Sequence, residues 1–265
     1  MTLEPGVKDL RRWPASVSAP SAGQPGAEPA PFTLVFLHHA GGSAAAFVPF
    51  VRCFPAEWNV FSVDLPGRMM TRGQRACRTS TQVLDFLLPR VRPLLNGPFA
   101  LFGHSMGALI AFESARELSR EGMPPAWVGL SGSAAPESRL DRARRHLWPR
   151  ERLTAFMREL GGTPESVFEM PDVLDVMVRV LRDDLAVVDT YRRHPGPPLR
   201  VPVSVFTGQD DPVAPPGAAA PWSEQTTART TAHSWPGGHF YLFDHVEAVG
   251  RAIRREIDAV CPAAR

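Results

Sequence analysis

The sequence predicts an α/β fold in which helices cover both faces of a mostly parallel sheet. Two features of the 265-residue chain support this prediction. Short apolar runs alternate with amphipathic segments of helical periodicity, as they do in βαβ units. The alternation is interrupted once, at about 137–194, where only helical patterns occur. We therefore expect a single domain over 32–265 that carries a helical insertion at about 137–194.

Residues 1–31 differ in composition from the rest of the chain. They contain six prolines among alanine, glycine and serine, so they can bury little apolar surface. We expect this leader to be mobile, with one short edge strand docking at most around Arg12 and Trp13.

Each element of the domain is predicted from its pattern. The run 32–37 is continuously apolar and bounded by proline and polar residues, which is typical of a buried strand. The segment 79–95 has helical spacing, although Pro89 and Pro93 must kink or shorten it. In chain order, the predicted strands are 32–37, 59–64, 99–102, 126–131, 201–206 and 230–235, and the predicted helices are 44–54, 79–95, 109–118, 151–160, 164–169, one that begins at 171, and 245–260.

Charge and composition argue against several classes of protein. A formal net charge of +2 argues against a nucleic-acid partner. No apolar stretch reaches the roughly 18 residues of a membrane span, and the N-terminus lacks the apolar core of a signal peptide. The three cysteines, Cys53, Cys77 and Cys261, are widely spaced and odd in number, which predicts a reducing compartment and no metal site. We expect a cytoplasmic monomer without membrane contact.

The strand at 99–102 leads directly into Gly-His-Ser-Met-Gly, and an amphipathic segment follows. This order of strand, sharp turn and helix is typical of a nucleophile elbow, which exposes a serine hydroxyl at the apex of a strained turn. The five-residue pattern is weak by itself because glycine and serine are common in loops. The strand before it and the helix after it make Ser105 the predicted nucleophile.

A serine hydroxyl needs a base, and the base needs an orienting carboxylate. Of the eight histidines, His239 is favoured because it lies in a Gly-rich loop directly after the last predicted strand. His104 adjoins Ser105, but adjacent residues on an elbow point apart, so we expect it to be a packed neighbour. Asp210 and Asp211 follow the penultimate strand; Asp211 is preferred as the acid because it lies one residue past the tight turn and precedes a proline. Solvated turn residues remain the alternative interpretation of both carboxylates.

An acyl-transfer intermediate needs two N–H donors aimed at one oxygen. Met106, the residue after the nucleophile, supplies one. The loop at 39–42, His-Ala-Gly-Gly, is suited to supply the other because its small residues let the backbone approach a substrate. A simple Gly-rich turn is the alternative interpretation of this loop.

Together these motifs resemble the type II (editing) thioesterases that accompany modular polyketide synthases and nonribosomal peptide synthetases. The resemblance extends from residue 32 to the C-terminus. The motifs are specific to the family when they are taken together. It departs from the family pattern at His38, where a proline is expected, and at 68–71, where Arg-Met-Met-Thr replaces a Gly- and Arg-rich continuation. The matching segments are 39–44, 65–68, 103–108, 181–184 with Tyr191, 208–213 and 237–242.

The resemblance implies an α/β-hydrolase fold with a helical lid. It also implies hydrolysis of acyl groups from the phosphopantetheine thiol of acyl or peptidyl carrier proteins, which clears stalled chains in antibiotic biosynthesis. It places the second oxyanion donor at Ala40, and it implies no bound cofactor because the substrate itself carries the phosphopantetheine. The alternatives are a small-molecule esterase or acyl transferase (cyclase) of the same fold, or a non-catalytic module that binds carrier proteins.

Two side-chain sets in the insertion fit such a substrate, and each has a simpler interpretation. Flexible apolar side chains could accept varied acyl chains or could pack against the core. An arginine cluster could receive an acidic carrier protein or form a solvated face. The apolar set is Phe156, Met157, Phe168, Met170, Met177 and Leu181, and the arginine set is Arg139, Arg142, Arg144, Arg145, Arg150 and Arg152.

Overall fold

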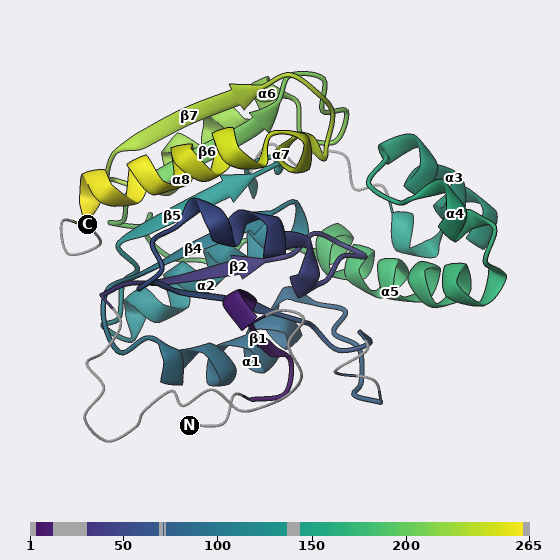
Figure 1. Ribbon diagram of the computed structural model, residues 1–265, viewed down its shortest axis with the longest axis horizontal. Coiled ribbons are helices and arrows are strands. Elements are labelled where there is room, and N and C mark those ends of the chain that lie inside the picture. Colours follow the sequence, from purple (N-terminus) through teal and green to yellow (C-terminus); the bar gives the residue numbers. More distant parts are fainter. Residues whose placement is uncertain (1–3, 13–30, 69–70, 72, 137–143, 262–265) are drawn as a thin grey trace.

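A seven-stranded sheet forms the centre of the molecule in the computed structural model, which describes residues 4–12, 31–68, 71, 73–136 and 144–261 (Figure 1). The strand order is β1-β3-β2-β4-β5-β6-β7, and all neighbours are parallel except β1, which pairs antiparallel with β3. The carboxyl ends of β2, β4, β5, β6 and β7 therefore meet at one edge of the sheet, as the sequence predicts. The strands are β1 (Val7–Asp9), β2 (Thr33–Leu37), β3 (Asn59–Val63), β4 (Phe99–His104), β5 (Trp127–Ser131), β6 (Val203–Gly208) and β7 (Thr230–Trp235).

Helices cover both faces of this sheet, with an apolar cluster under each layer (Figure 1). On one face lie α1 (Ser80–Val91) and α2 (Met106–Arg120), whose buried side chains pack against the sheet. On the other face lie the 3-10 helix η2 (Ala44–Cys53) and α8 (Val246–Val260). The shorter helices are η1 (Leu10–Arg12), η4 (Arg92–Leu94), η6 (Arg145–Leu147), α6 (Pro216–Ala219), η7 (Ala220–Gln225) and α7 (Tyr241–Asp244).

The insertion forms a helical lobe beside one end of the sheet (Figure 1). It contains α3 (Arg150–Leu160), α4 (Glu165–Phe168) and α5 (Pro171–Thr190), and its described part, 144–194, contains no strand. Residues 137–143 of the predicted insertion lie outside the described residues. The lobe has its own small apolar core, made by Leu153, Met157, Leu174, Val178, Leu181 and Leu185.

Two predicted helices differ from those in the structure, and both contain proline. The segment predicted as a helix over 44–54 is a 3-10 helix rather than an α-helix, with Pro49 within it. The helix predicted over 79–95 ends as an α-helix at Val91, and Pro93 lies in the first turn of η4. Thr79 caps α1 by accepting a hydrogen bond from the Gln82 amide (3.2 Å).

Part of the proline-rich leader packs on the domain. The edge strand expected around Arg12 and Trp13 lies instead at Val7–Asp9, because Val7 and Leu10 supply buried apolar side chains there. Arg11 fixes this segment by donating from Nε to the Trp58 carbonyl (2.7 Å). Residues 13–30 of the leader lie outside the described residues, so its predicted mobility stays a prediction.

None of the helices in the described part of the chain combines the length and the apolar character that a membrane span requires.

The turn between β4 and α2 is packed tightly against β2. A Cβ at Gly107 would lie 2.0 Å from the Leu37 carbonyl oxygen, and a Cβ at Gly103 would lie 2.0 Å from the Gly107 carbonyl oxygen. Both neighbours are backbone atoms, so neither can turn aside. Glycine at these positions is therefore a packing requirement of the strand–turn–helix unit.

We expect Gly107→Ala to lower the free energy of unfolding by about 3 kcal/mol or more, because overpacking against backbone forces the sheet or α2 to shift. Urea unfolding checks this. Gly217→Ala is the matched control, since nothing lies within 4 Å of a Cβ at that position in α6. Equal unfolding midpoints for the two variants would contradict the packing requirement.

Two histidines are buried where parallel strands end. His104, at the end of β4, is fully buried, and its Nδ1 is hydrogen-bonded to the Ser131 hydroxyl (2.9 Å). His38 follows β2, is 2% exposed, and donates from Nδ1 to the His39 carbonyl (2.8 Å). Burial lowers the pKa of both rings well below the usual value, and the nearby charges of Arg68 (for His38) and His239 (for His104) lower it further. Both rings are neutral in the folded protein.

We expect stability to fall as the pH drops below about 6.5, because each ring binds a proton only after unfolding. Each such histidine contributes a slope of up to about 1.4 kcal/mol per pH unit. Urea unfolding at several pH values measures this slope. His104→Gln should reduce the slope of the unfolding free energy against pH by the contribution of one histidine. His245→Gln, at a partly exposed position, serves as the control. An unchanged slope in His104→Gln would show that this ring is charged in the fold.

Candidate active site

Ser105 lies at the apex of the turn between β4 and α2 in a strained backbone conformation. Its φ of 58° and ψ of −114° make it the one non-glycine residue with positive φ among the described residues. Its N–H donates to the carbonyl of Ser131 at the end of β5 (2.7 Å), which fixes the turn to the neighbouring strand. The elbow predicted from the sequence is thus formed at the carboxyl edge of the sheet.

The sheet brings the three predicted side chains into one hydrogen-bonded chain. His239 donates from Nδ1 to Asp211 Oδ2 (2.8 Å), and its Nε2 lies 3.0 Å from Ser105 Oγ. Asp211 follows β6 and His239 follows β7, and these strands are parallel neighbours, so both loops reach the same edge. The second oxygen of Asp211 accepts from the amides of Val213 (2.8 Å) and Ala214 (3.0 Å). Both Asp211 and His239 are buried.

The neighbouring candidates lie outside this chain of hydrogen bonds. Asp210 is exposed and its backbone N–H donates to the Gly237 carbonyl (3.0 Å). His104 is the packed neighbour that the sequence predicts: its ring centroid lies 4.9 Å from that of His239. His39 packs edge-on against Phe240, and burial, together with His239 and Arg68, lowers its pKa to about 3.

Of the two predicted oxyanion donors, Met106 adjoins Ser105 in the chain, and Ala40 lines the same cavity as Ser105. Met106 is the first residue of α2, where backbone N–H groups have no partner within the helix. Ala40 lies in the turn at 39–42, which Gly42 closes by donating from its N–H to the His39 carbonyl (3.0 Å). Both Ala40 and Ser105 line the same cavity. The helix N-terminus adds a favourable field for negative charge at this point.

A cavity of about 570 Å³ opens over Ser105 between the sheet edge and the insertion. Its lining is mostly apolar on the insertion side, where α3 and α5 contribute side chains. A Cβ at Gly162, in the loop after α3, would lie 2.6 Å from the Phe240 ring, so the insertion reaches the residue that follows His239. The insertion side of the cavity is lined by Phe156, Leu160, Leu181, Leu185 and Val188, with the polar side chains Arg145 and Glu159.

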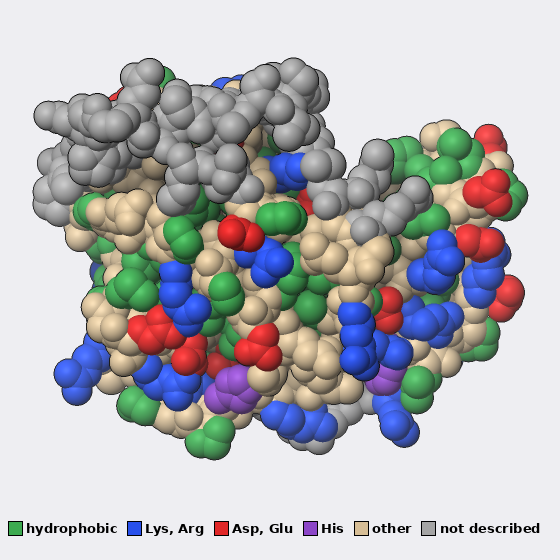
Figure 2. All heavy atoms as spheres, turned by 90° about the horizontal axis from the view of Figure 1, so that it is seen from below, with side chains coloured by type: hydrophobic (Ala, Val, Ile, Leu, Met, Phe, Trp, Pro, Cys, Tyr) green, Lys and Arg blue, Asp and Glu red, His purple; other side chains and the backbone are tan. Residues whose placement is uncertain are grey.

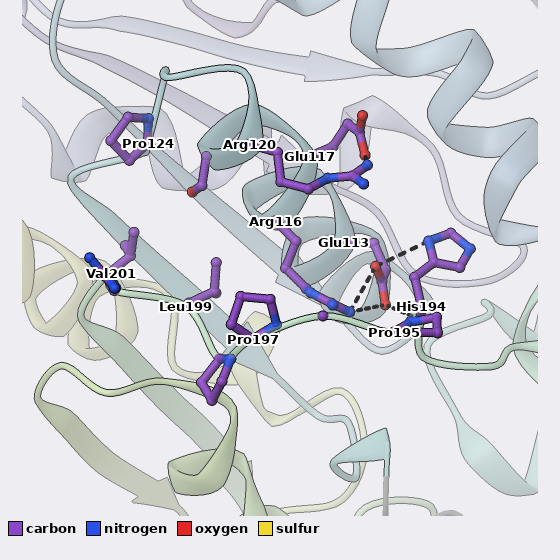
Figure 3. A pocket seen from close by; sticks show the side chains of 14 residues that line it. Glu113, Arg116, Glu117, Arg120, Pro124, His194, Pro195, Pro197, Leu199 and Val201 are labelled. Carbon is purple, nitrogen blue, oxygen red and sulfur yellow. Dashed lines mark hydrogen bonds and ion pairs between the residues drawn. The ribbon is translucent and has the colours of Figure 1, made fainter.

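A second cavity, of about 310 Å³, lies between α2 and the segment that follows α5 (Figure 3). None of the residues of the Ser105 site lines it. At its wall the buried Glu113 carboxylate accepts a hydrogen bond from the Tyr191 hydroxyl (2.7 Å) and forms an ion pair with Arg116. His194 Nδ1 lies 3.4 Å from the same carboxylate (Figure 3). These contacts hold the end of α5 on α2.

The apolar and arginine side chains that the sequence singles out in the insertion lie in different environments. Phe156 and Leu181 line the cavity, Met157 lies in the core of the lobe, and Met170 is exposed. Figure 2 shows basic and acidic side chains side by side at the lobe end of the molecule. Three of the six predicted arginines make internal contacts: Arg145 with Asp189, Arg150 with Asp175, and Arg152 with the Trp148 ring. Arg144 is exposed. Arg139 and Arg142 lie outside the described residues.

Two polar residues at the site were given no role by the sequence patterns. Arg68 and Asp184 form a buried ion pair beside the turn at 39–42. Both belong to segments that match the family motifs, and this was the only signal in the sequence. Their partnership joins positions 116 residues apart, which no local pattern can indicate.

The described residues contain no group of three or more histidine, cysteine or acidic side chains placed to hold a metal ion. The three cysteines are free thiols, and burial raises the pKa of Cys77 to about 11, so its thiol is protonated at neutral pH.

Comparison with known proteins identifies the family. The thioesterase domain family model matches residues 32–257. The gramicidin S biosynthesis protein GrsT of Aneurinibacillus migulanus is 31% identical over 239 residues, which cover 90% of this chain and 91% of that protein. The structure of BorB, a type II thioesterase from the borrelidin biosynthetic cluster, is 33% identical with a TM-score of 0.84, covering 97% of this chain and 99% of BorB. YbtT, a type II thioesterase from the yersiniabactin NRPS/PKS pathway, is 26% identical with a TM-score of 0.77, covering 91% and 96%.

The parallel sheet, the flanking helices and these structural relatives confirm the predicted α/β-hydrolase fold. Since the family model spans most of the chain and the relatives align over nearly their whole lengths, we conclude that this chain belongs to the thioesterase family.

Proposed function

We propose that this thioesterase hydrolyses acyl groups from the phosphopantetheine thiol of carrier proteins and so edits stalled chains in polyketide or nonribosomal peptide biosynthesis. The observation that carries the proposal is the continuous chain of hydrogen bonds from Ser105 through His239 to Asp211 beside a cavity whose insertion side is mostly apolar. The names of GrsT, BorB and YbtT, which place those relatives in biosynthesis of this kind, support it.

In the proposed reaction Ser105 Oγ attacks the thioester carbonyl carbon while His239 Nε2 takes the hydroxyl proton. The carbonyl oxygen becomes an oxyanion, which the amides of Ala40 and Met106 stabilise. The C–S bond then breaks, and the departing sulfur takes the proton from His239. An acyl ester of Ser105 and a free phosphopantetheine thiol result.

Water completes the cycle. His239 takes a proton from a water molecule that attacks the ester carbonyl, and it returns that proton to Ser105 as the C–O bond breaks. The products are a carboxylic acid and the free enzyme. Asp211 keeps the imidazole in the tautomer that has its proton on Nδ1 and stabilises the imidazolium that forms in each step.

The surroundings of the triad fit a broad acyl substrate. Most of the side chains that α3 and α5 contribute to the cavity wall are apolar, and Glu159 is the polar one, so most of this wall offers apolar contact area to an acyl chain. The enzyme needs no cofactor of its own because the substrate carries the phosphopantetheine. We also propose that it acts as a cytoplasmic monomer on acyl or peptidyl carrier domains.

We expect Ser105→Ala to abolish acyl-enzyme formation and to leave the fold intact, because the hydroxyl contributes one hydrogen bond at the cavity surface. Intact-protein mass spectrometry after mixing with an acyl-loaded carrier protein measures the acyl-enzyme, and urea unfolding checks the fold. Full turnover by Ser105→Ala would reject the assignment of the nucleophile.

The same assay with acyl-carrier, acyl-coenzyme A and simple ester substrates tests the substrate class. A preference for acyl-carrier substrates supports the editing function, whereas a preference for the simple ester would favour an esterase. Failure of a serine-directed phosphonate to label the wild-type protein would favour a non-catalytic module that binds carrier proteins.

The two adjacent aspartates provide a matched test of the acid. We expect Asp211→Asn to lower kcat by about 10³- to 10⁴-fold, since the amide favours the wrong imidazole tautomer. Asp210→Asn changes the exposed neighbour, which lies outside the hydrogen-bond chain, and should leave kcat nearly unchanged. Steady-state hydrolysis of an acyl thioester measures both. Equal losses in the two variants would reject Asp211 as the orienting carboxylate.

A further inference from the structure

The segment that carries the Ala40 amide forms a tight turn against the lid helix α5. Gly41 has a φ of +77°, the positive value that the third residue of a type II turn requires. The turn is closed by the hydrogen bond from the Gly42 N–H to the His39 carbonyl (3.0 Å). That carbonyl and the Ala40 N–H belong to the same peptide unit, so this bond fixes the plane of the proposed oxyanion donor.

Two side chains from distant segments fix the other peptide units of the turn. Asp184 Oδ2, on α5, accepts a hydrogen bond from the Gly41 N–H (2.7 Å). Arg68, in the loop after β3, donates from Nε to the Gly42 carbonyl (3.0 Å). Arg68 Nη2 also forms an ion pair with the same oxygen of Asp184. One ion pair therefore holds the turn from two sides.

The burial of this pair calls for an explanation other than stability. The side chains of Arg68 and Asp184 are 7% and 2% exposed. Removing two charges from water costs about as much as their attraction returns, so a buried ion pair is weak evidence for a stabilising role. The hydrogen bonds that both side chains make to the turn give the pair a different role.

The turn at 39–42 could adopt a second conformation, which the Arg68–Asp184 ion pair excludes. Type I and type II turns differ chiefly in the orientation of the central peptide, which is rotated by roughly 180° between them. Here the central peptide joins Ala40 to Gly41, and its rotation would turn the Gly41 N–H away from Asp184. Glycine permits either orientation, so the carboxylate selects one for the peptide that adjoins the unit carrying the Ala40 N–H. Leu181, one turn before Asp184 on α5, packs against Gly41 from the same side.

We infer that Arg68 and Asp184 are positioning residues for thioester hydrolysis, which hold the turn at 39–42 so that the Ala40 amide faces the oxyanion. The inference rests on the proposed function, in which Ala40 is one of the two oxyanion donors. Asp184 belongs to the lid helix, so a single carboxylate links the position of the lid to the geometry of the oxyanion hole.

The test compares Asp184→Asn with Glu113→Gln, a matched control. Both carboxylates are 2% exposed, both are ion-paired to an arginine, and both hold α5 in place. Only Asp184 contacts the turn that carries Ala40. The measurements are kcat and KM with an acyl N-acetylcysteamine thioester, the Kd of phenylboronic acid, which forms a tetrahedral adduct with an active serine, and the thermal midpoint.

We expect Asp184→Asn to lower kcat by about 10- to 100-fold, below the 100- to 1,000-fold typical of a lost donor, because the amide is displaced rather than removed. KM should change less than three-fold, and the Kd of phenylboronic acid should rise at least ten-fold. Glu113→Gln should lower the thermal midpoint similarly while keeping kcat and the boronate Kd within about two-fold. Equal effects of the two variants on kcat and on the boronate Kd would overturn the inference.

A second variant covers the case in which Asp184→Asn unfolds because Arg68 is left buried without its partner. Arg68→Met combined with Asp184→Leu removes both charges and fills the space, which often restores stability. This double variant should fold with a thermal midpoint near that of the wild type and still show the reduced kcat. A stable double variant with wild-type kcat would also overturn the inference.

Ser105→Ala separates this inference from the proposed function. If Ser105→Ala retains turnover, the proposed function itself fails. If Ser105→Ala is inactive and the Asp184 and Glu113 variants behave alike, the hydrolase assignment stands and only the positioning role is lost.

Discussion

The strained backbone of Ser105 is the constraint on which the rest of the site depends. A non-glycine residue with a φ of 58° costs about 1–3 kcal/mol and persists only where its surroundings leave no alternative. Here Gly103 and Gly107 allow β4, the turn and α2 to pack at distances that no side chain would permit. The bond from the Ser105 N–H to Ser131 secures the turn from the adjacent strand. Packing of the turn against the sheet therefore offsets the cost of the strained backbone, and the Ser105 hydroxyl lies at the edge of the sheet.

The parts of this arrangement that follow from local pattern could be predicted from the sequence. Continuous apolar runs indicate the parallel strands, and the loops after parallel strands meet at one edge of the sheet, so the sequence alone predicts that Ser105, Asp211 and His239 lie close together. The preference for Asp211 over Asp210 rested on turn position, and the structure places Asp211 in the buried hydrogen-bond chain and Asp210 in solvent. The catalytic roles of these side chains are the proposal that the experiments address.

The parts that depend on distant contacts could not be predicted. β1 has three residues and lies in a proline-rich segment, so only its pairing with β3 makes it a strand. η2 is a 3-10 helix that buries Phe47 and Phe50, and the periodicity of the sequence does not separate such a segment from an α-helix. The role inferred for Arg68 and Asp184 depends on their ion pair, which joins the loop after β3 to α5.

The close approach of Gly162 to the ring of Phe240 sets how near the loop after α3 lies to the segment that follows β7. With a φ of +79°, residue 162 adopts a conformation suited to glycine, and even one methyl group there would meet the aromatic ring at 2.6 Å. A larger residue would have to push the loop after α3 away from the sheet edge. The distance between this loop of the insertion and the segment after β7 therefore depends on the absence of a side chain at residue 162.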